Sequence, residues 1–162
     1  MPAKPPNSIL FVCLGNICRS PLAEGVFKSV INETGADIVV DSAGTGAWHI
    51  GNPPDPRSIA VAAKHGIDIA TQRARQLHPS DFERFDLLLG LDRSNVSALR
   101  TRAPGDARGR VHLFLEYAGM GPLDVPDPYY GGDDGFETVY RMIREASEGL
   151  SAKLGARAAS PP

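Results

Sequence analysis

Short apolar runs alternate with longer amphipathic stretches along most of the chain. Residues 8–13 are apolar almost throughout and rich in β-forming side chains, a pattern typical of a strand buried on both faces of a parallel sheet. Residues 22–33 instead carry apolar side chains at helical spacing, and Ser20-Pro21 before them is a helix start signal. The same alternation predicts strands at 38–40, 86–90 and 110–113, and helices at 57–65, 92–102 and about 134–153. We expect Gly66 to close the helix at 57–65 and Asp92 to cap the helix at 92–102.

Strands that alternate with helices predict an α/β fold. We expect a doubly wound, four-stranded parallel sheet of the flavodoxin-like type with helices on both faces. Such sheets bind ligands beyond the carboxyl ends of their strands. The Gly- and Pro-rich stretches 43–56 and 118–133 interrupt the alternation, and their length predicts functional loops.

The chain has 162 residues, of which 42% are hydrophobic, enough for one domain with a sizeable core. We expect a single domain over residues 8–154. The Pro-rich residues 1–7 predict a flexible N-terminal extension, and the small residues of 155–162 predict a flexible C-terminal tail.

Charge and cysteine content narrow the function classes. The formal net charge is −2, which argues against nucleic acid as a partner. The first apolar run is too short for a signal peptide or a membrane span, so a cytoplasmic protein without membrane insertion is expected. Two cysteines do not make a disulfide scaffold, and in a reducing compartment they indicate catalysis, redox sensing or metal binding.

The segment Cys13-Leu14-Gly15-Asn16-Ile17-Cys18-Arg19-Ser20 joins the first expected strand to the first expected helix. Its backbone N–H groups can turn inward at the positive end of the helix and form a nest for a dianion. The same donors would stabilise a thiolate at Cys13, which makes it a candidate nucleophile. Arg19 can bind two phosphoryl oxygens, and Ser20 can donate to the sulfur. A buried structural cysteine is the alternative for Cys13, whereas a nucleotide P-loop is excluded because no Gly-Lys-Ser/Thr follows.

Loss of a phenolate from a phosphate ester is faster when an acid protonates the leaving oxygen. Asp127 is the best candidate because two prolines restrict its backbone and Tyr129 and Tyr130 follow it, where they could wall an aromatic pocket. Asp124 is the reserve candidate. Simple turn chemistry at Asp-Pro remains the alternative for this motif alone.

Together these motifs resemble the low-molecular-weight protein tyrosine phosphatases over roughly residues 8–154. The resemblance rests on residues 13–21 and on Asp41-Ser42-Ala43-Gly44, Gly51-Asn52-Pro53-Pro54-Asp55, Lys64-His65-Gly66-Ile67 and Asp127-Pro128-Tyr129-Tyr130-Gly131. It implies that Cys13 is the nucleophile that forms a phosphocysteine, Arg19 the phosphate clamp and Asp127 the general acid and base.

The resemblance also assigns supporting roles. Residues 14–20 would bind phosphate, and a network that holds the loop would comprise Asn16, Ser20, Ser42 and His65. The substrate cleft would be lined by Leu14, Trp48, Tyr129 and Tyr130. Cys18 would trap oxidised Cys13 as a reversible disulfide. The resemblance implies a monomer that needs neither cofactor nor metal and acts on tyrosine-phosphorylated proteins, with inorganic phosphate as product and inhibitor.

Three rival functions share some of these features. Arsenate reductases of the same fold use a further cysteine outside the nest, whereas both cysteines here lie within it. A silent phosphate-binding or redox-sensing module would not require an acid at Asp127. A zinc site at Cys13 and Cys18 has no second pair of ligands to complete it.

Overall fold

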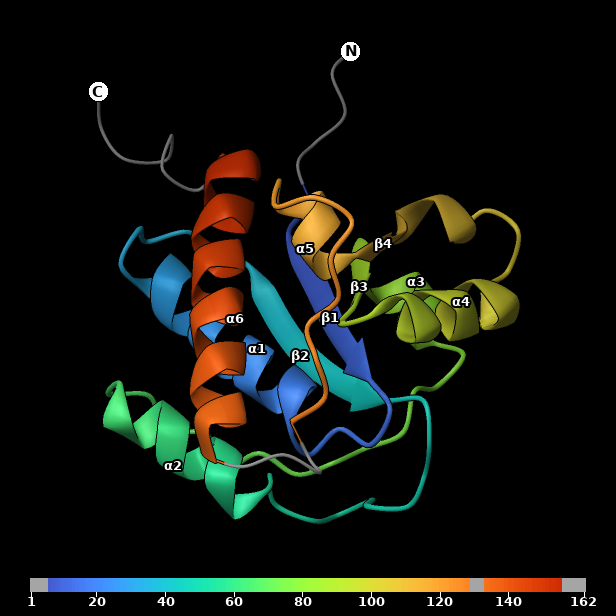
Figure 1. The fold of residues 1–162 in the computed structure, drawn as a ribbon. Coiled ribbons are helices and arrows are strands. Elements are labelled where there is room, and N and C mark those ends of the chain that lie inside the picture. Colours follow the sequence, from blue (N-terminus) through green and yellow to red (C-terminus); the bar gives the residue numbers. More distant parts are fainter. Residues whose placement is uncertain (1–5, 129–132, 156–162) are drawn as a thin grey trace.

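The computed structural model describes residues 6–128 and 133–155. At its centre lies a four-stranded sheet whose strands are all parallel and run in the order β2-β1-β3-β4 (Figure 1). The strands are β1 Ser8–Cys13, β2 Val39–Gly44, β3 Leu87–Gly90 and β4 Val111–Leu113. The doubly wound α/β fold expected from the sequence is confirmed.

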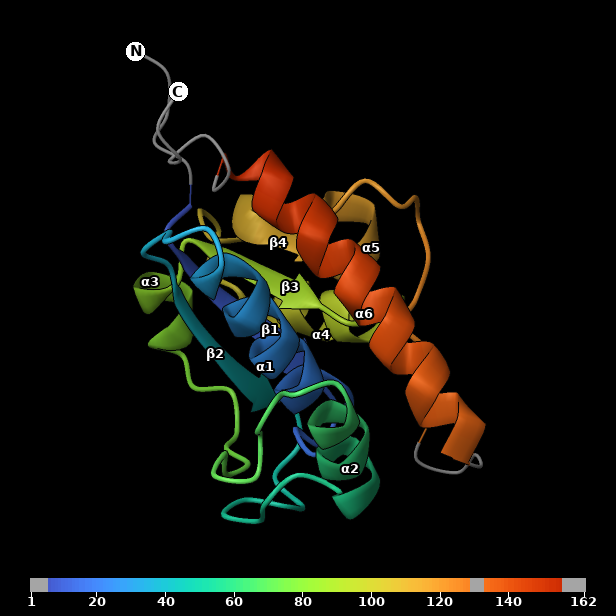
Figure 2. The same cartoon turned by 90° about the vertical axis from the view of Figure 1, so that its left-hand side faces the viewer.

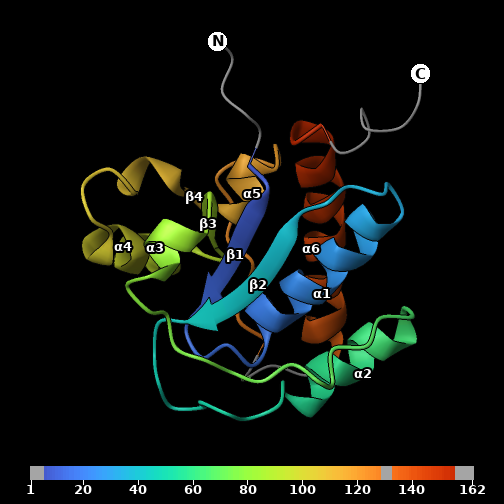
Figure 3. The same ribbon diagram turned by 180° about the vertical axis from the view of Figure 1, so that it is seen from behind.

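Helices cover both faces of the sheet, as Figures 2 and 3 show from two further sides. One face packs against α1, α2, α5 and α6, and the other against α3 and α4. The elements are α1 Arg19–Asn32, α2 Pro56–Lys64, α3 Asp81–Arg84, α4 Arg93–Arg102, η1 Arg108–Arg110, α5 Phe114–Tyr117 and α6 Asp133–Lys153.

The central strand β1 is buried on both sides because its alternate side chains enter two different cores. Ile9 and Phe11 pack in the cluster on the α1 and α6 side, and Phe11 contacts Phe114 edge to face at 5.0 Å. Leu10 and Val12 pack in the cluster on the α4 side. An apolar residue is therefore needed at nearly every position, which is the pattern that the sequence showed.

Two kinds of element differ from the prediction. Strand β2 extends to Gly44, four residues beyond the predicted end at residue 40, and its register pairs the polar Ser42 with Phe11. The short elements α3, α5 and η1 were not predicted, because three or four residues are too few to show a helical period.

Capping residues set two of the helix ends as expected. The side chain of Asp92 accepts a hydrogen bond from the N–H of Asn95 at 2.8 Å and begins α4. Gly66, with φ of 79°, follows the end of α2. The expected N- and C-terminal extensions lie largely outside the described residues. Within those residues, no helix is both long and apolar enough to cross a membrane.

Candidate active site

The loop between β1 and α1 closes over the carboxyl edge of the sheet. It runs from Cys13, the last residue of β1, to Arg19, the first residue of α1. Cys13 pairs with Gly44 at the end of β2, and Figure 3 shows the two strand ends side by side. A Cβ at Gly44 would lie 2.8 Å from the carbonyl oxygen of Leu14, so glycine at this position lets the loop pack directly against the strand.

Neighbouring segments fix the direction of the loop's peptide units. Their backbone N–H groups donate to three loop carbonyls: Thr45 to Cys13 at 3.0 Å, Gly46 to Leu14 at 2.9 Å and Asp55 to Ile17 at 2.7 Å. Because the C=O and N–H of a trans peptide point in opposite directions, the N–H groups of Leu14, Gly15 and Cys18 turn away from these contacts. They face the interior of the loop, which forms a nest suited to an anion.

Donors also surround the sulfur of Cys13. The backbone N–H of Asn16 donates to Cys13 Sγ at 3.2 Å, and Ser20 Oγ lies 2.9 Å from the same sulfur. Asn16 reaches this geometry with φ of 58°, in the left-handed region that asparagine tolerates better than most residues. The Asn16 N–H and the Ser20 hydroxyl can therefore both donate to this sulfur.

A chain of buried hydrogen bonds holds the loop from below. Asn16 Nδ2 donates to Ser20 Oγ at 2.8 Å and to Ser42 Oγ at 3.0 Å. Ser42 donates onward to Glu24 Oε1 at 2.7 Å, and Lys28 pairs with Glu24 Oε2 at 2.6 Å. The structure thus brings together three of the four expected network residues and adds Glu24, whose buried carboxylate links the network to an exposed lysine.

The prediction that His65 belongs to this network is wrong. His65 caps the end of α2 and faces α6, where its ring packs on Tyr140 at 3.8 Å and Nε2 lies 3.0 Å from Glu137 Oε2. The remaining acceptor of Asn16, its Oδ1, receives the backbone N–H of Arg75 at 3.0 Å instead. A backbone N–H, and not the expected histidine, therefore completes the network around Asn16.

Arg19 is held rigidly although its charge is nearly buried. Its side chain is 4% exposed, and Nη1 donates to Asp92 Oδ2 at 2.7 Å and to the carbonyl oxygen of Val125 at 2.9 Å. Burial alone would lower the pKa of Arg19, but the negative charge of Cys13 and the hydrogen bond and charge of Asp92 outweigh it and raise the pKa. The guanidinium stays charged, and Nη2 lies 3.7 Å from Asp127 Oδ2.

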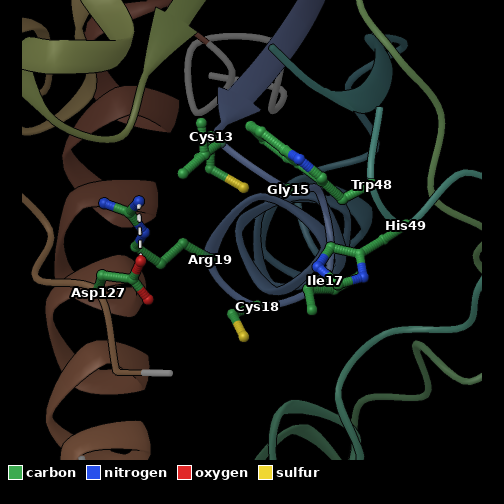
Figure 4. Close-up of a pocket in the computed structure, with 9 residues that line it drawn as sticks. Cys13, Gly15, Ile17, Cys18, Arg19, Trp48, His49 and Asp127 are labelled. Atoms are coloured by element: carbon green, nitrogen blue, oxygen red, sulfur yellow. Dashed lines mark ion pairs between the residues drawn. The ribbon is translucent and has the colours of Figure 1, made fainter. Parts of the chain in front are cut away.

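A cavity of about 410 Å³ opens above the loop (Figure 4). Asp127 and Arg19 lie on one side of it, and Trp48 and His49 reach in from the other. The Asp127 carboxyl is 45% exposed, so it can reach a ligand in the cavity. The lining residues are Cys13, Leu14, Gly15, Ile17, Cys18, Arg19, Trp48, His49 and Asp127.

Other expected site residues are placed differently or not at all. Asp124 pairs with Arg93, whose backbone N–H donates to its Oδ1 at 2.9 Å, and it does not line the cavity. Of the two candidate acids, the geometry therefore favours Asp127. Tyr129 and Tyr130 lie outside the described residues.

Cys18 is the second free thiol of the loop. Burial raises the pKa of the Cys18 thiol to about 12, and the charges of Asp55, Cys13 and Asp127 add to that rise against a smaller opposing effect of Arg57. At neutral pH, Cys18 is thus a neutral thiol beside the nest.

Two functional side chains were missed in the sequence. Asp92 was expected only to cap α4, yet its second oxygen binds Arg19. A signal existed, because Asp92 follows β3, the neighbour of β1, at the same sheet edge. Glu24 lies four residues after Ser20 and so on the same helix face, which could have linked it to the network.

In the described part of the chain, no cluster of three or more His, Cys, Asp or Glu side chains could hold a metal ion.

Comparisons with known proteins agree with this geometry. Residues 8–160 match the family model described as low molecular weight phosphotyrosine protein phosphatase. A low molecular weight protein-tyrosine-phosphatase of Streptomyces coelicolor is 49% identical over 90% of this chain and 92% of its own length. The low molecular weight phosphotyrosine protein phosphatase of Schizosaccharomyces pombe is 46% identical over 86% and 92%, respectively. A crystal structure of a protein tyrosine phosphatase from Entamoeba histolytica, with Hepes in the active site, superposes with a TM-score of 0.86 at 37% identity, covering 91% of this chain and 96% of that one.

Proposed function

Because this chain belongs to the low molecular weight phosphotyrosine protein phosphatase family, we propose that it hydrolyses phosphotyrosyl and small aryl phosphates through a phosphocysteine on Cys13. The observation that carries the proposal is the convergence of Cys13, Arg19 and Asp127 on one cavity. These residues supply a nucleophile, a fixed cation and an acid, which are the groups that this reaction needs.

Substrate binding would use the nest and Arg19 together. The dianionic phosphoryl group sits among the inward N–H groups of residues 14–20, and the guanidinium of Arg19 binds two of its oxygens. Asp92 and Val125 hold Arg19 in place before substrate arrives, so little reorganisation remains for the transition state. Leu14 and Trp48 are exposed at the rim and would flank the aromatic ring of the substrate, with Tyr129 and Tyr130 proposed to complete the cleft.

The first chemical step forms a sulfur–phosphorus bond. The Cys13 thiolate attacks phosphorus while the bond to the phenolic oxygen breaks, and the leaving electron pair goes to that oxygen. Asp127, in its acid form, gives the oxygen a proton, so a neutral phenol departs. Its exposed position opposite the Trp48 side of the cavity suits a group that must reach the leaving oxygen.

The second step regenerates the enzyme. The Asp127 carboxylate takes a proton from water, the water oxygen attacks phosphorus, and the sulfur–phosphorus bond breaks. The sulfur leaves as a thiolate that the Ser20 hydroxyl and the Asn16 N–H can stabilise. Inorganic phosphate is the product, and because it fits the same nest it would also inhibit.

We also propose the domain organisation, the cellular location and the cofactor requirement of the protein. Residues 8–154 would act as a single domain with flexible extensions at 1–7 and 155–162, in a cytoplasmic monomer that dephosphorylates tyrosine-phosphorylated proteins without cofactor or metal. Two free thiols in one loop suit a reducing compartment. Cys18 would protect oxidised Cys13 as a disulfide, at a rate limited by how seldom the Cys18 thiol ionises.

The test is hydrolysis of para-nitrophenyl phosphate and of a phosphotyrosyl peptide, with EDTA and a reductant present. We expect turnover by the wild type and none by Cys13→Ser. Asp127→Asn should lose more activity on the peptide than on para-nitrophenyl phosphate, because para-nitrophenolate leaves without a proton. Asp124→Asn is the matched control, since that carboxylate pairs with Arg93 outside the cavity. A folded, reduced wild type that turns over neither substrate would refute the proposal.

A further inference from the structure

One carbonyl of the nest is anchored by a side chain rather than by a backbone N–H. The hydroxyl of Ser58 donates to the carbonyl oxygen of Cys18 at 3.2 Å. Ser58 is 0% exposed and lies 40 positions away in sequence, in the first turn of α2. Cys18 is the N-cap residue immediately before α1, and its own side chain makes no capping hydrogen bond. The contact therefore joins the start of one helix to the loop that begins another.

The peptide unit between Cys18 and Arg19 is the one affected. Its carbonyl points toward Ser58, so its N–H, which belongs to Arg19, points the opposite way and into the nest. A hydroxyl that donates to the carbonyl also polarises the peptide, which makes the N–H at its other end a stronger donor. Ser58 can thus influence a phosphate that it never touches.

The segment that carries Ser58 is itself fixed. The backbone N–H of Asp55 donates to Ile17, and the Asp55 side chain accepts from the N–H of Arg57 at 2.9 Å to cap α2. Pro56, at the first helical position, restricts the same turn. Asp55 and Ser58 therefore hold two successive carbonyls of the nest from one rigid helix start.

We propose that Ser58 is a positioning residue of the phosphate-binding loop, which orients and polarises the Cys18–Arg19 peptide so that the Arg19 N–H binds the phosphoryl group. This inference rests on the proposed function for its effect on turnover. Its effect on phosphate binding can be measured whether or not the chain proves to be a phosphatase.

The experiment compares Ser58→Ala with Ser147→Ala. Ser147 is equally buried, in α6, and within the described residues its hydroxyl has no hydrogen-bond partner, so it controls for removal of a buried serine oxygen. For each protein we would measure the dissociation constant of inorganic phosphate by calorimetry, kcat and KM for para-nitrophenyl phosphate, and Tm. One neutral hydrogen bond is worth about a fivefold change in an equilibrium.

We expect Ser58→Ala to bind phosphate about fivefold more weakly and to lose kcat by a similar factor, at temperatures well below its Tm. Ser147→Ala should match the wild type in both. A purely structural role for Ser58 would lower Tm and leave phosphate affinity and kcat unchanged, and that result would overturn the inference. A wild type that binds phosphate without turnover would refute only the proposed function.

If Ser58→Ala does not fold, a second pair of variants decides. Ser58→Thr keeps the hydroxyl, and Ser58→Cys keeps the size with a much weaker donor. The inference requires Ser58→Thr to bind phosphate more tightly than Ser58→Cys. Equal affinities would overturn it.

Discussion

The thiol of Cys18 should be almost inert to alkylation at neutral pH, with a pH dependence unlike that of an ordinary cysteine. The variant Cys13→Ser isolates this group, because the chain has only two cysteines. Burial is the largest cause that raises the pKa of Cys18 to about 12, and the charges of Asp55 and Asp127 remain in the variant. Only the contribution from Cys13 is removed.

The magnitude follows from the thiolate fraction. A cysteine with the reference pKa of 9.0 is about one-tenth thiolate at pH 8, whereas one with a pKa of about 12 is about one ten-thousandth thiolate. Since the thiolate is the reactive form, Cys18 should react about a thousandfold more slowly than a free thiol. Its rate should still rise about tenfold for each pH unit up to pH 10.

The assay is alkylation of folded Cys13→Ser by iodoacetamide between pH 7 and 10, followed by intact-mass spectrometry. The same variant unfolded in guanidinium provides the reference rate. Restricted access slows the reaction at every pH, so the slope and not the absolute rate tests the ionisation. A rate that levels off below pH 9.5 would refute the reasoning.

The same shift has a consequence for stability. The pKa of Cys18 is higher in the folded than in the unfolded protein, so the folded state binds its proton more tightly. The stability that this proton contributes is fully present below the unfolded pKa and is lost as pH rises toward about 12. Urea denaturation of Cys13→Ser should therefore show a midpoint that falls above about pH 9, and Cys18→Ala in the same background should lose that part of the fall.

Three further substitutions test the side chains around the loop. Asp92→Asn keeps a residue that can cap α4 but removes the anion that pairs with buried Arg19. We expect kcat/KM for para-nitrophenyl phosphate to fall at least tenfold, while the far-ultraviolet circular dichroism spectrum stays unchanged. An unchanged kcat/KM would show that Val125 alone holds the guanidinium. Glu24→Gln weakens the bonds to Ser42 and to its lysine partner and should cost about 1–2 kcal/mol in urea denaturation, whereas an unchanged free energy of unfolding would show that the buried charge adds nothing. Trp48→Ala removes a ring that is 70% exposed at the cavity rim, so KM for a phosphotyrosyl peptide should rise about fivefold with Tm unaffected; a loss of Tm without a change in KM would assign that ring to packing.

The sequence predicted the fold and the place of the loop between β1 and α1 well because both depend on local patterns. The apolar run of β1, the turn residues after it and the proline at the start of α1 lie within 14 consecutive positions, 8–21. Each of these features can therefore be recognised from residues that are neighbours in the sequence. The same holds for Asp92 as a helix cap, because a cap and the N–H that it binds are three residues apart.

Contacts between distant segments could not be predicted in this way. The role of Asp92 in holding Arg19 depends on the order of strands in the sheet, which brings together residues 73 positions apart. His65 failed for the same reason. Its motif resembles that of the family and suggested that His65 supports the loop. However, the C-terminal end of α2 faces α6, where His65 contacts Glu137. Sequence spacing says nothing about that orientation.

The claim that Cys13 becomes phosphorylated is central, and rapid-quench trapping tests it most directly. Wild type and Asp127→Asn would be mixed with excess para-nitrophenyl phosphate, quenched in acid within milliseconds and digested for mass spectrometry. Para-nitrophenolate leaves readily, so hydrolysis limits the rate, and the loss of the base in Asp127→Asn should let the intermediate accumulate further. The account predicts one phosphate on the peptide that contains Cys13, more of it in Asp127→Asn than in the wild type. Phosphate on another residue, or turnover without any phosphate on Cys13, would contradict it.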